Sequence, residues 1–204
     1  MRYVVVEHLE PCISPWLLSE YSYLSKLFKM RTVFTNVKDR GQAELLRKYG
    51  TVFMEDFLST LPKLGVSNAI ILDPKASKPL RREELVNADA VIVGGIMGDH
   101  PPRGRTEELI TSRARHLIAR NLGEKQLTIA GVAYVLKEIE DGRELGELDI
   151  RYGLQISVKI KDFELVVDLP YAFPYRDGKP VLPEDYVEVI TKKSLTFEDN
   201  PCIG

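Results

Sequence analysis

Two short apolar runs constrain the fold of this chain more than any other feature. Residues 68–73 read NAIILD and residues 89–94 read DAVIVG, and a proline or a further glycine follows each run. Runs of this kind are typical of parallel strands that are buried on both faces of a sheet. Strand-like and helix-like segments alternate around them over residues 1–141. The alternation predicts an α/β fold with a mostly parallel, doubly wound sheet and helices on both faces.

The remaining elements follow from apolar spacing and from capping residues. Further strands are expected at residues 2–6, 31–37 and 116–121. Helices are expected from Ser14 onwards and over residues 39–49, 53–64, 81–86, 106–113, 128–140 and 184–192. The first helix has the clearest signal, because Pro15 follows a capping Ser14 and apolar residues then recur at helical spacing.

The pattern changes after residue 150. Residues 154–160 and 164–169 alternate between apolar and polar side chains, which predicts a β-hairpin that turns at residues 161–162. Residues 170–182 are rich in proline and aromatic residues and are expected to form a loop. We expect one domain over residues 1–204, with residues 151–182 as a hairpin and loop elaboration.

Composition and charge exclude several classes of protein. The apolar runs are far shorter than the roughly 20 residues of a membrane span, and the first residues, MRYVVVEH, favour an opening strand over a signal peptide. We therefore expect a cytoplasmic protein that does not bind membranes. A net charge of −2 lowers the expectation of a dedicated nucleic-acid binder. Cys12 and Cys202 are too few for a disulfide framework or a structural zinc site, and whether they pair stays open.

Residues 94–106, GGIMGDHPPRGRT, form the most unusual segment of the chain. They leave a predicted strand at the sheet edge where ligands bind in open α/β folds, together with the loops after residues 68–73 and 116–121. Gly94, Gly95 and Gly98 let the backbone approach a ligand closely, but their spacing does not match a dinucleotide or P-loop motif. The segment predicts a ligand site, with a purely structural turn as the alternative.

Asp99 and His100 of this segment are candidate acid, base or metal-binding groups. The alternative is that they fix the loop by hydrogen bonds. The other histidines, His8 and His116, offer no metal-binding motif, so no metal is predicted.

Two further groups of charged residues are candidates for binding. Glu7 and Glu10 flank His8 after the first strand and would receive a cationic substrate group, unless they belong to a polar loop and a helix cap. Trp16 and Tyr21 are expected in the core. Several arginines would hold a carboxylate, a phosphate or RNA, unless they form a solvated helix face: Arg103, Arg105, Arg113, Arg115 and Arg120.

Five motifs follow one another in a distinctive order. They are EH-L-E and S-x-W-x3-EY in residues 7–21, LDP at 72–74, GGIMGDHPPRGRTEEL at 94–109, LGEKQLT at 122–128 and DGKPVLPE at 177–184. Together they resemble the SPOUT-class methyltransferase family, and within it the S-adenosylmethionine-dependent arginine methyltransferases that act on a ribosomal protein.

This resemblance implies a Rossmann-like sheet with a C-terminal trefoil knot, and S-adenosylmethionine bound among three loops at the knot. The implied cofactor-binding residues are Leu72, Asp73, Pro74, Gly94, Gly95, Ile96, Gly98, Asp99, His100, Pro101, Leu122, Gly123, Gln126, Leu127 and Thr128.

An arginine acceptor is protonated in water, so carboxylates must orient it and favour loss of a proton. Glu7 and Asp99 are the predicted catalytic residues, with Glu10 in reserve. The alternatives are a SPOUT-type RNA methyltransferase, a non-catalytic S-adenosylmethionine-binding module and a metal-dependent hydrolase built on Asp99 and His100. The acceptor and the oligomeric state stay open.

Overall fold

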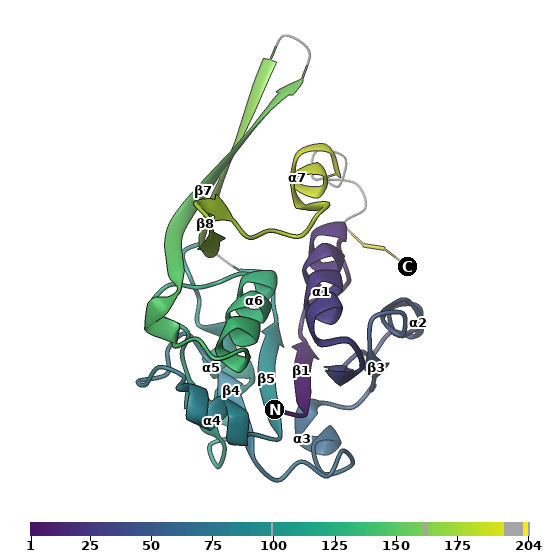
Figure 1. The fold of residues 1–204 in the computed structure, drawn as a ribbon. Coiled ribbons are helices and arrows are strands. Elements are labelled where there is room, and N and C mark those ends of the chain that lie inside the picture. The colour runs from purple at the N-terminus through teal and green to yellow at the C-terminus, as the bar shows by residue number, and fades with distance from the viewer. Residues whose placement is uncertain (99, 161–162, 194–201, 204) are drawn as a thin grey trace.

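The computed structural model describes residues 1–98, 100–160, 163–193 and 202–203. Its centre is a six-stranded sheet with the order β3-β2-β1-β5-β4-β6, in which every pair of neighbours is parallel (Figure 1). The strands are β1 (Tyr3–His8), β2 (Thr32–Thr35), β3 (Thr51–Val52), β4 (Ala69–Leu72), β5 (Ala90–Gly95) and β6 (Ile118–Arg120). The predicted α/β fold with a mostly parallel sheet is confirmed.

Helices cover both faces of this sheet. On one face lie α1 (Pro15–Phe28), α2 (Arg40–Leu46), α4 (Arg82–Asn87) and α6 (Ile129–Glu140). On the other face lie α3 (Phe57–Thr60) and the segment of α5 (Arg105–Leu109) and the 3-10 turn η2 (Thr111–Arg113). The other described elements are the 3-10 turns η1 (Lys29–Arg31) and η3 (Leu145–Glu147), helix α7 (Tyr186–Glu188) and the π-helical turn η4 (Val189–Lys193). Helices α1 and α6 lie side by side on one face, as Figure 1 shows. Within the described ranges, no helix is both long enough and apolar enough to cross a membrane.

The core is divided by the sheet into two layers. Val4 and Val6 point to the side of α1, α2, α4 and α6, whereas Val5 points to the side of α3 and η2. This alternation is the two-residue period of a strand. All three valines are fully buried, as expected for a central parallel strand.

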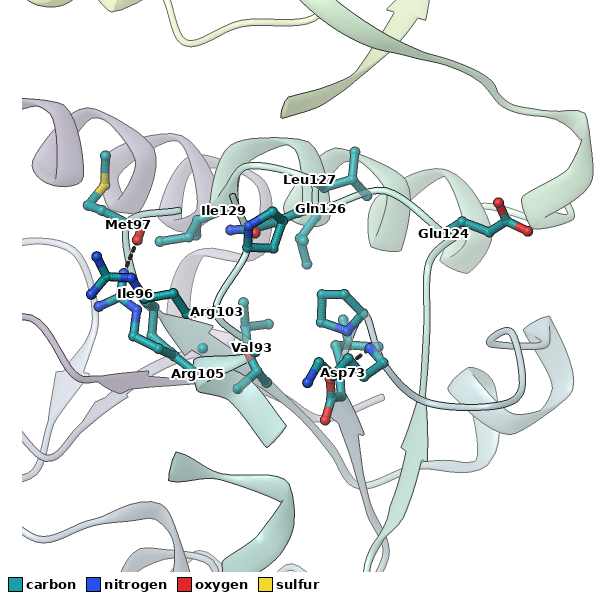
Figure 2. A pocket seen from close by; sticks show the side chains of 18 residues that line it. Asp73, Val93, Ile96, Met97, Arg103, Arg105, Glu124, Gln126, Leu127 and Ile129 are labelled. Carbon is teal, nitrogen blue, oxygen red and sulfur yellow. Dashed lines mark hydrogen bonds between the residues drawn. The ribbon is translucent and has the colours of Figure 1, made fainter. Parts of the chain in front are cut away.

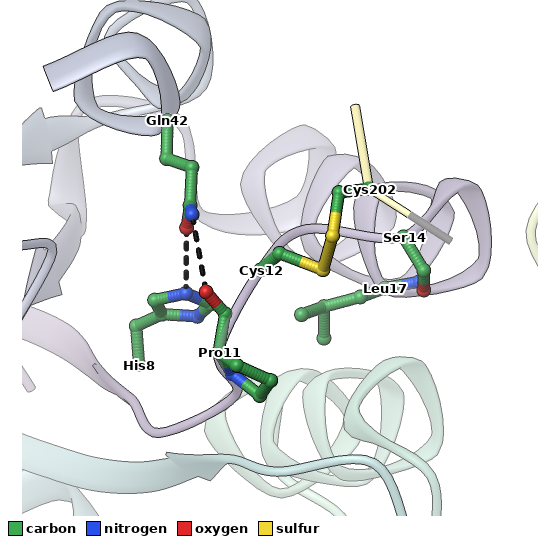
Figure 3. Close-up of a disulfide and its surroundings, with 7 residues drawn as sticks. All are labelled: His8, Pro11, Cys12, Ser14, Leu17, Gln42 and Cys202. Carbon is green, nitrogen blue, oxygen red and sulfur yellow. Dashed lines mark hydrogen bonds between the residues drawn. A yellow bond between two sulfur atoms is a disulfide. The ribbon is translucent and has the colours of Figure 1, made fainter. Parts of the chain in front are cut away.

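The first helix begins as the sequence predicts. The Ser14 hydroxyl accepts the Leu17 N–H at 3.1 Å, and Pro15 occupies the first turn. Just before this cap, Cys12 forms a disulfide with Cys202, with the two Cα atoms 5.4 Å apart (Figure 3). The Ile203 N–H also donates to the Ile13 carbonyl at 2.8 Å, so residues 202–203 lie against the segment just before α1.

A second, antiparallel sheet follows α6. It consists of β7 (Asp149–Ile160), β8 (Phe163–Arg176) and β9 (Lys179–Pro180), and β7 and β8 rise away from the main sheet in Figure 1. Its base packs through Ile156, Leu169 and Phe173 against Tyr186 and Ile190. The residues expected at its turn, 161–162, lie outside the described ranges.

The prediction of a loop over residues 170–182 is wrong. Strand β8 continues to Arg176, because its prolines and aromatics pair with residues 149–152 of β7. Ala172 donates its N–H to the Gln126 carbonyl at 2.8 Å, which fixes the strand against the loop before α6. Aromatic residues favour strands, and this continuation contributes Tyr171 to one wall of the site.

Two other element predictions are also corrected. Residues 53–64 are mostly turn, since only α3 is helical there, and the unpredicted strand β3 precedes it. Gly50 leads into β3 so close to β2 that an added Cβ would lie 2.5 Å from the Thr32 carbonyl oxygen. The helix predicted from Thr106 begins instead at Arg105, with Gly104 as its N-cap at φ +73°. A glycine is favoured there because other residues rarely adopt that backbone conformation.

Candidate active site

Three loops meet at the carboxyl edge of the parallel strands, where they enclose the central cavity. The loops follow β4, β5 and β6, and they contribute lining residues between positions 72–75, 94–106 and 124–127. Val93, Ile129 and Val132 complete the wall from β5 and α6, and the cavity has a volume of about 200 Å³. The three loops are the ones that the strand pattern predicts to converge.

The cavity has an apolar floor and a charged rim. Leu72, Val93 and Ile129 form apolar surface, and Figure 2 shows Ile129 and Leu127 on the side of α6. Asp73, Arg103, Arg105 and Glu124 lie around its edge, as do Lys75 and Gln126. An apolar hollow with a few placed polar groups suits a small organic ligand that carries charges at its ends.

Asp73 fixes the loop after β4. Its carboxylate accepts the Thr111 hydroxyl at 2.6 Å and the Lys75 N–H at 2.9 Å, and its own N–H donates to the Arg120 carbonyl at 2.9 Å. The side chain is 3% exposed. Asp73 therefore lines the cavity with a carboxylate whose orientation is already set.

Glu10 fixes the loop after β5. Its Oε1 atom accepts the Met97 N–H at 2.8 Å and an Arg105 N–H at 3.1 Å, while the Arg105 guanidinium also donates to the Met97 carbonyl (Figure 2). Glu10, predicted as a reserve catalytic residue, thus contacts the Met97 backbone and the Arg105 side chain, both of which line the cavity. This geometry is that of a positioning residue.

Glu7 lies on the other side of the sheet. Its Oε2 atom accepts the Thr35 hydroxyl at 2.6 Å and the Phe57 N–H at 2.9 Å, and the side chain is 0% exposed. Burial raises the pKa of this carboxyl, and the two hydrogen bonds partly offset that shift. Because strand side chains alternate in direction, the residue that follows Val6 points away from the cavity. The structure does not bring Glu7 to the site, and its predicted catalytic role lacks the necessary geometry.

Gly95 does not line the cavity but packs closely against Tyr21 and Glu7. A Cβ at this position would lie 2.3 Å from the Tyr21 hydroxyl and 2.8 Å from the Glu7 carbonyl oxygen. The Tyr21 hydroxyl lies 2.9 Å from His8 Nδ1, and His8 Nε2 lies 3.0 Å from Gln42 Oε1 (Figure 3). Burial lowers the pKa of the His8 imidazole, which favours its neutral form. Tyr21 is a core residue, as predicted.

The other predicted cofactor-binding residues lie in different places around the cavity. Those that line the central cavity are Leu72, Asp73, Pro74, Gly94, Ile96, Gln126 and Leu127. Gly98 and Thr128 line a neighbouring hollow, and Leu122 and Gly123 line a third one beside Asp73. His100 and Pro101 are exposed and line none of the three hollows, whereas Asp99 lies outside the described residues.

The neighbouring hollow, here called the side hollow, contains residues that sequence reasoning missed. Trp16, Glu20 and Tyr171 line it together with Gly98, and it shares Ile96, Met97, Gln126, Leu127 and Ile129 with the central cavity. Trp16 was expected in the core, but it lies at this wall and is only partly buried. The four-residue spacing of Trp16 and Glu20 places both on one face of α1, a signal that the sequence does contain.

The predicted arginine cluster is dispersed. Arg105 pairs with Glu10, Arg113 pairs with Asp56, and Arg120 donates from Nε to Glu84 at 2.9 Å. These ion pairs stabilise separate parts of the chain. Over the described residues, no group of three or more His, Cys, Asp and Glu side chains is arranged to hold a metal ion.

Known proteins are similar to this chain in sequence and in fold. The family described as "Protein arginine N-methyltransferase SFM1-like" matches residues 3–196. Protein arginine N-methyltransferase SFM1 of Saccharomyces cerevisiae is 30% identical over 220 residues, which cover 98% of this chain and 99% of the yeast protein.

Solved structures agree with this assignment. Yeast arginine methyltransferase SFM1 complexed with SAH has a TM-score of 0.82 at 25% identity, covering 93% of this chain and 95% of that one. Its complex with SAM has a TM-score of 0.80 at 25% identity, covering 95% and 91%.

A dual specific Trm10 from Thermococcus kodakaraensis shares the fold. Its TM-score is 0.56 at 13% identity, covering 72% of this chain and 96% of that one. The prediction of a methyltransferase is confirmed. The match over residues 3–196 and the full-length alignment show that this chain belongs to the SFM1-like protein arginine N-methyltransferase family.

Proposed function

We propose that this protein transfers a methyl group from S-adenosylmethionine to an arginine side chain of a protein. The observation that carries the proposal is the central cavity, which lies at the junction of the three predicted loops in a chain of this family. SAM and SAH are bound by the yeast relative of the same fold, which supports S-adenosylmethionine as the cofactor.

The residues around the cavity fit such a cofactor. Leu72, Val93 and Leu127 would contact its apolar parts, and the loop at Gly94 would present backbone groups close to it. When bound, S-adenosylmethionine supplies an electrophilic methyl group on a sulfonium. The chain contributes alignment of the acceptor and exclusion of water, because displacement at a methyl carbon depends mainly on geometry.

The acceptor is proposed to be an arginine of a ribosomal protein. The order of motifs along the sequence supports this substrate, and a cytoplasmic location accords with it. The RNA alternative depends on arginines that would hold phosphates. Since Arg105, Arg113 and Arg120 are engaged in ion pairs with Glu10, Asp56 and Glu84, the geometry favours a protein acceptor.

A trefoil knot at the cofactor site is also proposed. Asn121, just after β6, donates from its side chain to Ala76 O at 2.7 Å and from its N–H to Lys78 O at 2.9 Å, and its carbonyl accepts the Leu80 N–H at 2.9 Å. These bonds bind the segment leading to α6 against the loop after β4, as threading through that loop requires. Stretching the reduced protein from both termini tests the proposal. A knotted chain stops short of the full extension that its residues permit, and an unknotted chain reaches it.

The activity is tested with labelled S-adenosylmethionine and an extract of cells that lack this protein. We expect label in a protein band that survives nuclease treatment, and mass spectrometry of that band should identify methylarginine. Label confined to RNA would support the RNA methyltransferase. SAH binding without turnover would support the non-catalytic module.

A cavity-filling variant tests the cofactor site. Val132→Trp should weaken SAH binding by about 10–100-fold because it fills the cavity. Val86→Trp, at an exposed position of α4, is the matched control.

A further inference from the structure

The side hollow lies directly beside the proposed cofactor cavity. Its own walls come from α1, the loop after β5 and strand β8, through Trp16, Glu20, Gly98 and Tyr171. Gln126 and Leu127 belong to both spaces, so a group in the side hollow would face a ligand in the central cavity. These positions suit the two reactants of a transfer reaction.

Glu20 is the acidic group of this hollow, and its side chain is 1% exposed. One carboxylate oxygen accepts the Trp16 indole N–H at 3.3 Å, and the other accepts the Ala130 N–H. Within the described part of the chain, the groups that act on this carboxylate are backbone N–H and side-chain N–H or O–H groups, and none is a lysine or arginine. A buried carboxylate without a cationic partner is costly, and a cationic ligand would offset that cost.

The chemistry of the hollow selects a planar cation. A guanidinium presents N–H groups in a fork that matches a carboxylate, and it also stacks on aromatic rings. Trp16 and Tyr171 supply such rings beside Glu20. An ammonium or an RNA phosphate lacks this combination of charge and shape.

We propose that the side hollow is the binding site of the acceptor arginine and that Glu20 is the carboxylate that receives its guanidinium. This inference rests on the proposed methyl transfer to arginine. A terminal nitrogen of the guanidinium forms a bond to the methyl carbon while the carbon–sulfur bond breaks, and the bonding electron pair remains on sulfur. One N–H proton leaves the methylated nitrogen for the Glu20 carboxylate and then passes to solvent.

The hollow must widen to admit the acceptor. Its volume is about 20 Å³, and the Tyr171 hydroxyl closes it by donating to the Gly98 carbonyl at 2.6 Å. A Cβ on Gly98 would lie 2.5 Å from both the Tyr171 ring and the Gln126 side-chain nitrogen. The acceptor would therefore enter by separating Tyr171 from Gly98.

Glu20 also has a structural role, which the test must separate from the binding of an acceptor. The Ala130 N–H belongs to the first turn of α6, so the carboxylate also caps that helix. Glutamine keeps one oxygen that accepts this N–H, gives up the oxygen that accepts the Trp16 indole N–H, and lacks the charge that attracts a guanidinium. Glu20→Gln therefore separates the two roles.

The test compares wild type with Glu20→Gln in SAH affinity by calorimetry, in thermal unfolding and in the initial rate of labelling with extract proteins as acceptors. We expect SAH affinity within about threefold of wild type and a labelling rate lower by about 100-fold or more. The carboxylate variant Glu20→Asp should recover part of the rate. If Glu20→Gln labels acceptor proteins at the wild-type rate, the inference about Glu20 is overturned. The proposed function still stands in that case, because wild type labels protein. Absence of protein labelling by wild type would instead refute the proposed function.

A second measurement uses the wild-type protein, so it does not depend on how the variant folds. Guanidinium chloride at low millimolar concentration should inhibit labelling in competition with the acceptor and not with S-adenosylmethionine. Tetramethylammonium chloride has the same charge without N–H groups and should inhibit less at equal ionic strength. Equal inhibition by the two salts would overturn the assignment of Glu20.

Discussion

Loss of the Cys12–Cys202 disulfide should destabilise the protein substantially. The bond joins residues 190 positions apart, so it closes almost the whole chain into a loop. A crosslink restricts the unfolded chain, and by the loop-entropy relation a loop of this length is worth about 5 kcal/mol at 25 °C. Measured values for native disulfides are about 2–5 kcal/mol, since residual structure in the unfolded chain reduces the effect.

The perturbation is the double variant Cys12→Ser/Cys202→Ser, compared with oxidised wild type in urea denaturation. We expect the free energy of unfolding to fall by about 2–5 kcal/mol and the midpoint temperature to fall by roughly 4–20 °C for a domain of this size. Wild type with reductant is the control, because it should unfold like the variant.

The expected loss of stability depends on the length of the loop that the disulfide closes. A loss below about 1 kcal/mol, with the oxidised state verified by thiol titration, would show that the crosslink does not restrict the unfolded chain as calculated. A difference between reduced wild type and the variant would assign the loss to the serines.

Three further predictions follow from other contacts. Glu10→Ala releases Met97 and Arg105 from the loop after β5, so SAH affinity should fall by about 10-fold in calorimetry, and unchanged affinity would remove Glu10 as a positioning residue. Gly95→Ala places a methyl group against the Tyr21 hydroxyl and should cost about 1–3 kcal/mol in urea denaturation, whereas a neutral effect would contradict this close packing. Hydrogen bonds from the Ser67 and Asn68 N–H groups lower the pKa of Asp89 to about 2, so the stability that this carboxylate contributes is present above pH 4 and is lost as the pH falls through 2. In the Asp89→Asn variant the free energy of unfolding should depend less on pH in that range, and a pH dependence equal to that of wild type would refute this.

The parts of the fold that sequence predicts well are those set by local physics. Residues 69–72 and 90–95 form buried parallel strands because their side chains are apolar in every position but the glycines. Ser14 and Pro15 define the start of α1: the Ser14 hydroxyl accepts the Leu17 N–H, and Pro15 has no N–H that would lack a partner in the first turn. The meeting of the three loops follows from the parallel direction of the strands, so the place of the candidate site was predictable too.

The side chains that face the site were harder to predict. Glu7 and Glu10 are close in sequence, yet Glu7 turns to the opposite face of the sheet while Glu10 holds Met97. Glu20 reaches the site only because α1 packs on α6, so that it meets Ala130 across 110 residues of sequence. The spacing of Trp16 and Glu20 places both side chains on one face of α1, but only tertiary packing determines what that face contacts. The continuation of β8 was missed for the same reason, since Ala172 is fixed by the distant Gln126.

The most direct test of the central claim is a crystal structure of this protein with S-adenosylhomocysteine. We expect the ligand in the cavity between Asp73, Ile96 and Leu127, with its sulfur facing the side hollow that contains Glu20. A ligand bound elsewhere, with this cavity filled only by solvent, would contradict both the assigned cofactor site and the function derived from it.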